Sequence, residues 1–109
     1  MDHTSITDAF GTTYIDPSEA KIKSLVESLF TKSTEACPHK DLSISHYKSG
    51  YSLVYHDNNI LTLENLNELE PQIKFIRGIT IKKATELFSA LNKNQIDSII
   101  NQPWQVQAS

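Results

Sequence analysis

The sequence predicts an α+β fold, in which an antiparallel sheet of about four strands packs against an N-terminal helix and two C-terminal helices. Polar and apolar residues alternate through residues 42–66, as they do in strands that are buried on one face. Two helix-start signals precede segments whose apolar residues recur at helical spacing. The chain has 109 residues, 39% of them hydrophobic, which suits one domain spanning residues 1–109.

The N-terminal part is expected to hold an irregular arm and then a helix. Residues 1–13 are mostly polar and predict the arm, although a segment near residues 10–15 could pair at one edge of the sheet. A helix is predicted over residues 17–31, with Asp16 as its cap, Pro17 in the first turn and Glu19 at a position favoured in a capping box. Its apolar stripe comprises Ile22, Leu25, Val26, Leu29 and Phe30.

Residues 42–66 are predicted to form a meander of three strands. Ser49-Gly50 is a signal for a two-residue turn, in which glycine supplies a positive φ. A turn at that place pairs Ile44 with Tyr55 and puts His46 on the inner face, as a hydrogen-bonded core histidine.

The second turn of the meander is predicted to be a three-residue loop of Asp57, Asn58 and Asn59. Asn59 would adopt the left-handed conformation, and Leu61 would then face Tyr55. This register makes one face of the sheet apolar and the other polar. The predicted outer face carries Ser43, Ser45, Tyr47, Ser52, Val54, His56, Thr62 and Glu64.

The C-terminal third predicts a fourth strand and two helices. The strand runs from Ile73 toward Gly78, and Thr80 can cap the helix that follows. A short third helix is expected over residues 95–102, and Trp104 is expected to fold back onto the core. The stripe of the second helix comprises Ile81, Ala84, Leu87, Phe88 and Leu91.

Composition excludes several classes of protein. The net charge is −3, and the basic residues after Lys74 come without aromatic stacking platforms, so nucleic-acid binding is not predicted. No apolar run is long enough to span a membrane, and residues 1–14 lack the features of a signal peptide, so we expect a cytoplasmic protein without membrane contact. The single cysteine, Cys37, excludes an intramolecular disulfide, and with His39 it supplies too few ligands for a structural metal site. No cofactor is predicted.

Two groupings of residues on the predicted outer face are candidate sites. His56 and Glu64 would lie one strand apart and could do acid–base work, but no phosphate loop, metal constellation or nucleophile accompanies them, so no enzyme is predicted. Tyr47, Ser52 and Glu64 would form one row across the sheet. Tyrosine is enriched at interfaces, whereas the alternative is ordinary cross-strand packing.

A series of short motifs extends from Asp16 to Trp104. In order, they are Asp16-Pro17-Ser18, His46-x-x-Ser49-Gly50-Tyr51-x-Leu53, Leu63-Glu64-Asn65-Leu66, Arg77-Gly78-Ile79 and Pro103-Trp104. The series resembles small bacterial immunity proteins, which are encoded beside polymorphic and contact-dependent growth inhibition toxins.

The resemblance implies a cytoplasmic protein that binds a cognate toxin domain, often a nuclease, and blocks its active site or substrate groove. The charge pattern agrees in sign, because residues 49–73 carry acidic side chains and no Lys or Arg, whereas a nuclease surface is basic. The predicted partner-binding residues are the anchors Tyr47 and His56 and the acids Asp57, Glu64, Glu68 and Glu70. Two alternatives remain: a small adaptor or regulatory domain that binds another protein through the same face, and a small enzyme.

Overall fold

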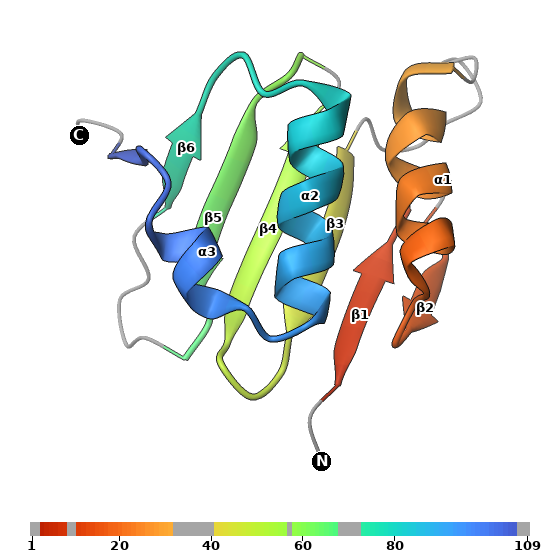
Figure 1. Cartoon of the computed structure of the whole chain (residues 1–109), viewed down its shortest axis with the longest axis horizontal. Helices are drawn as coiled ribbons and strands as arrows, with labels where there is room; N and C mark the ends of the chain where they lie inside the picture. The colour runs from red at the N-terminus through yellow and green to blue at the C-terminus, as the bar shows by residue number, and fades with distance from the viewer. Residues whose placement is uncertain (1–2, 9–10, 32–40, 57, 68–72, 107–109) are drawn as a thin grey trace.

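A computed structural model of the chain describes residues 3–8, 11–31, 41–56, 58–67 and 73–106 (Figure 1). In chain order its elements are β1 (Thr4–Thr7), β2 (Thr13–Ile15), α1 (Glu19–Thr31), β3 (Asp41–His46), β4 (Tyr51–His56), β5 (Leu61–Asn65), β6 (Lys74–Ile76), α2 (Ile81–Asn92), α3 (Ile96–Ile100) and β7 (Gln105–Val106). All seven strands form one antiparallel sheet in the order β2-β1-β3-β4-β5-β6-β7. The three helices lie on the same face of this sheet (Figure 1).

The predicted fold class is confirmed, but the number of strands is wrong. The sheet has seven strands rather than about four. Two of the extra strands are β1, within the predicted arm of residues 1–13, and β2, which begins at the end of that arm. Strand β1 lies between β2 and β3, and its Ile6 is fully buried. Ile6 is the single large apolar residue of that strand, too little for a periodic signal. The pairing of residues 13–15 at the sheet edge had been predicted as a possibility.

The core lies between the inner face of the sheet and the three helices. Strand residues such as Ile44, Leu53 and Leu61 meet the apolar stripes of the helices there, and all three are fully buried. In α1 the predicted stripe is buried at Ile22, Leu25, Val26 and Leu29, and in α2 at Ala84, Leu87, Phe88 and Leu91. Each large apolar side chain buried in this way stabilises the fold by about 1.5–3 kcal/mol.

The first hairpin of the meander has the predicted faces but a different register. Ile44 pairs with Leu53 rather than with Tyr55, a shift of two positions. The turn is longer than predicted, because the Gly50 N–H donates to the His46 carbonyl at 2.9 Å and the Ser49 hydroxyl lies 2.7 Å from Nδ1 of His46. A shift of two residues keeps every side chain on its face, since the side-chain period of a strand is two.

The second hairpin agrees with the prediction. Asn59 has a φ of 66°, in the left-handed region, and the His56 N–H donates to the Ile60 carbonyl. Tyr55 therefore pairs with Leu61. The Tyr55 hydroxyl donates to the carbonyl of Ile79 at 2.6 Å, which ties this hairpin to the approach of α2.

The helix starts confirm one predicted cap and correct another. Thr80 caps α2, with its hydroxyl accepting from the Lys83 N–H at 3.1 Å. Helix α1, however, begins at Glu19, and Ser18 is the residue whose hydroxyl accepts from the Lys21 N–H. Asp16 does not cap the helix, because its φ of 47° turns its carboxylate toward β1.

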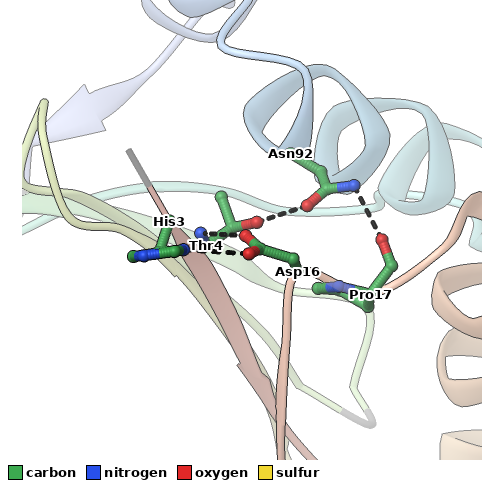
Figure 2. A network of polar contacts seen from close by, with 5 residues as sticks. All are labelled: His3, Thr4, Asp16, Pro17 and Asn92. Atoms are coloured by element: carbon green, nitrogen blue, oxygen red, sulfur yellow. Dashed lines mark hydrogen bonds and ion pairs between the residues drawn. The ribbon is translucent and has the colours of Figure 1, made fainter. Parts of the chain in front are cut away.

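A polar network anchors β1 to the helices, as Figure 2 shows. The Asp16 carboxylate accepts from the Thr4 N–H at 3.1 Å and lies 2.9 Å from Nδ1 of His3. The Asn92 side chain accepts from the Thr4 hydroxyl and donates to the Pro17 carbonyl at 2.9 Å. The hydrogen bond with His3, followed by the Thr4 N–H, lowers the pKa of Asp16. The side chains of Asn92, at the end of α2, and Asp16, before α1, thus hold a strand whose own sequence is mostly polar.

Candidate functional site

The described residues of the predicted site, Tyr47, His56 and Glu64, do not come together. Glu64 on β5 pairs with Ser52, whereas His56 lies four positions further along β4. At about 3.3 Å per residue, this separates His56 from Glu64 by ~13 Å along the sheet. The two residues lie on adjacent strands, as predicted, but this separation is too large for them to share a proton directly.

The predicted row of Tyr47, Ser52 and Glu64 is wrong. Ser45 takes the place of Tyr47, with its hydroxyl 3.1 Å from that of Ser52. Tyr47 lies in the turn after β3 and is 61% exposed. Its N–H donates to the carbonyl of His3, which directly precedes β1, and β1 pairs with β3 on the side away from β5. The two-residue shift of register is the cause.

Three of the predicted acids, Asp57, Glu68 and Glu70, lie outside the described residues. Of the predicted acidic edge, the structure therefore places Glu64.

A cavity of about 280 Å³ opens at Glu64, where β5 continues past the start of β6. Strand β6 pairs with β5 only from Leu61 to Leu63, so Glu64 and Asn65 extend beyond it. Helix α3 lies over this end of β5 (Figure 1). The lining residues are Tyr51, Leu63, Glu64, Asn65, Lys74, Ile100 and Trp104.

Two aromatic side chains form walls of the cavity. Tyr51 and Trp104 are partly buried and pack against the hydrophobic core. The indole N–H of Trp104 donates to the Ile99 carbonyl at 2.7 Å, which fixes the ring and confirms that Trp104 folds back. The charged lining residues are Glu64 and Lys74. The cavity thus combines aromatic surface with one carboxylate and one ammonium group.

Exposed apolar side chains belong to residues that line the cavity or adjoin its lining residues. Six large hydrophobic side chains are exposed in the described part of the chain, and four of them belong to this end of the molecule. Ile100 lines the cavity, and Leu66 directly follows the lining residue Asn65. Ile73 directly precedes the lining residue Lys74, and Val106 pairs with Lys74 across β6 and β7. We call Leu66, Ile73, Ile100 and Val106 the apolar rim. Grouped exposed apolar side chains are typical of surfaces that bind other proteins.

Tight packing around Gly50 holds the β5 end of the site in place. A Cβ atom at Gly50 would lie 2.5 Å from Nδ2 of Asn67 and 2.7 Å from Oδ1 of Asn65. The Leu66 N–H donates to the Gly50 carbonyl at 2.7 Å. The turn after β3 therefore sets the position of Asn65 and Leu66 beside the cavity.

The chemistry of the cavity is suited to binding. The seven residues that line it include no histidine, serine, threonine or cysteine. Among the residues that the structure describes, no group of three or more His, Cys, Asp or Glu side chains could hold a metal ion. Over the same residues, no helix is both long and apolar enough to cross a bilayer.

Sequence reasoning missed most of this site. Trp104 was expected to pack on the core but was not assigned to a site, although it is the only tryptophan of the chain. Leu66 and Ile73 lie on either side of the acidic sequence of residues 67–72, and both are exposed. Comparison of the chain with protein-family models, curated proteins and solved structures found no match.

Proposed function

We propose that this protein is an immunity protein that binds a cognate toxin domain, a basic nuclease, and blocks its active site or substrate groove. The contact surface in this proposal is the apolar rim together with the cavity at Glu64. The observation that supports it is that four exposed apolar residues line a cavity with aromatic walls or adjoin its lining residues.

The apolar rim supplies the driving force for association. Its side chains are between 43% and 56% exposed, so a partner would remove much of their surface from water. Burial of apolar surface contributes roughly 25 cal/mol per Å², and aromatic residues in pockets are typical of the energetic centres of interfaces. Tyr51 and Trp104 would occupy that centre.

The charge of the neighbouring sequence supports a basic partner. Residues 49–73 carry four carboxylates and no Lys or Arg, and Glu64 belongs to this stretch. A nuclease must attract phosphates, so an acidic surface would raise the rate of encounter and favour the correct orientation. Tyr47 and His56 remain predicted contacts, and a partner that touched them as well as Glu64 would have to extend across the sheet.

The alternative is a small adaptor or regulatory domain that uses the same surface. The two proposals differ in the partner. A toxin-domain gene immediately upstream of the gene for this chain would favour the immunity protein.

The test is a pull-down of the tagged protein from cells that carry its genomic neighbourhood, followed by mass spectrometry. Wild type is compared with Ile73→Ser in the apolar rim and with Ile15→Ser, a matched control because Ile15 is 58% exposed on the opposite edge strand, β2. We expect wild type and Ile15→Ser to retain one basic toxin fragment in equal amounts, and Ile73→Ser to lose it. Recovery of nothing, or of a housekeeping complex, would refute the immunity function.

A further inference from the structure

We propose that the cavity is the receptor for one arginine side chain of the partner, whose guanidinium group would stack on Trp104 and pair with Glu64. This inference rests on the proposed function, because it names the chemical group by which that partner is held. It goes beyond an apolar contact surface, since it predicts a specific cationic anchor.

The cavity is large enough for one long side chain. Sites for drug-sized ligands and cofactors occupy about 300–1,000 Å³. The cavity measures about 280 Å³, near the lower limit of that range, and its lining residues come from β4, β5, β6, α3 and Trp104. A single long side chain that enters from a docked protein fits this volume.

The lining favours a planar cation. The faces of Trp104 and Tyr51 carry partial negative charge and attract cations, most strongly at tryptophan. Arginine stacks on aromatic faces more often than lysine and forms paired hydrogen bonds with a carboxylate. Glu64 supplies that carboxylate, and Asn65 follows it on the part of β5 that extends beyond its pairing with β6.

Lys74 lines the same cavity and carries the opposite charge. It lies on β6 opposite Leu63 and is exposed, so its long side chain can keep the ammonium group in water. Its charge should nevertheless oppose a cationic occupant. The two charged lining residues therefore make opposite predictions: removing Glu64 should weaken binding of a cation, and removing Lys74 should strengthen it. An anionic occupant would reverse both effects.

The only tryptophan of the chain lies in the cavity wall, so its signals report occupancy directly. The probe is the peptide acetyl-Gly-Arg-Gly-amide, and its control replaces arginine by citrulline, which has the same shape but no charge. We expect the arginine peptide to shift the indole N–H resonance of Trp104 saturably, with the citrulline peptide about fivefold weaker.

Three variants complete the titration. Glu64→Gln should weaken binding of the arginine peptide about fivefold, and Lys74→Met should tighten it several-fold. Glu27→Gln, which removes an exposed acid on α1, should leave binding unchanged. Equal binding of both peptides, an unchanged affinity in Glu64→Gln, or weaker binding in Lys74→Met would each overturn the assignment.

This titration needs no toxin, so its outcome is separable from that of the proposed function. Capture of a toxin by a protein that does not bind the arginine peptide would overturn the cavity assignment alone. Binding of the arginine peptide by a protein that captures no toxin would support the cavity assignment and overturn the identity of the partner.

Discussion

Adding one methyl group at Gly50 tests the packing that holds the site in place. Gly50 has a φ of 78°, and a residue with a Cβ atom in the left-handed region costs roughly 1–2 kcal/mol. The new Cβ would also lie 2.5 Å from Nδ2 of Asn67 and 2.7 Å from Oδ1 of Asn65. Asn67 is exposed and can rotate away, but Oδ1 of Asn65 accepts from the Asn67 N–H at 2.9 Å, and loss of that bond costs about 1 kcal/mol.

The expected loss of unfolding free energy in Gly50→Ala is therefore about 2–3 kcal/mol, measured by urea denaturation at constant m-value. Gly11→Ala is the matched control, because Gly11 has a φ of 85° but no heavy atom within 4 Å of a built Cβ. It should lose only the backbone cost of about 1–2 kcal/mol.

The difference between the two variants isolates the packing at Asn65. In an Asn65→Ala background that difference should shrink, because the contact and its hydrogen bond are already absent. A Gly50→Ala variant no less stable than Gly11→Ala would refute the conclusion that this close approach positions the β5 end of the site.

Three further predictions concern polar groups. Tyr55→Phe removes a buried hydroxyl that donates to the Ile79 carbonyl, and should cost about 1–2 kcal/mol of stability by urea denaturation. Burial raises the pKa of Tyr55 above its ordinary 10.0, so wild-type stability should fall as the pH rises above 10, and less so in the variant. Asn92→Ala removes both of its contacts in Figure 2 and should cost about 1–3 kcal/mol by the same assay. Hydrogen bonding with His3 lowers the pKa of Asp16 below 3.8. The ionised Asp16 carboxylate therefore stabilises the fold above that pH, and this stabilisation is lost as the pH falls through the lowered pKa. Asp16→Asn should reduce this loss of stability in acid titrations followed by circular dichroism.

Each of these predictions has a control and a result that contradicts it. Tyr47→Phe alters an exposed ring and should leave stability unchanged, and equal effects of the two Tyr variants would argue against the buried hydrogen bond. Asn101→Ala changes an exposed asparagine after α3, and a loss as large as that of Asn92→Ala would show that the anchoring of β1 is not the cause. An acid unfolding curve that is the same for Asp16→Asn and wild type would contradict the conclusion that the Asp16 carboxylate stabilises the fold.

The sequence alone determined the elements whose signals are local. Thr80 and the apolar residues after it predict α2 correctly. The capping residue and the apolar residues with a period of 3.6 both lie within one continuous segment, so the sequence alone shows them. The loop that ends at Asn59 predicts the second hairpin with its register, since asparagine tolerates the left-handed conformation. The two faces of the meander also follow from the alternation of its residues.

Tertiary structure decided whatever depends on residues far apart in the chain. Strand β1 has one large apolar residue and is held by Asn92, 88 positions after Thr4, so no local pattern could reveal it. A period of two cannot distinguish registers that differ by two residues, and the contact of Ser49 with His46 in the longer turn selects between them.

The candidate site combines both kinds of information. Glu64 was predicted from charge, and Trp104 was predicted to pack on the core, but neither prediction defined a cavity. The cavity exists because β6 starts too late to cover the end of β5, while α3 and Trp104 approach from the other end of the chain. Side-chain chemistry is local and can be read from the sequence, whereas a concave surface is a relation between segments and is set only when they pack.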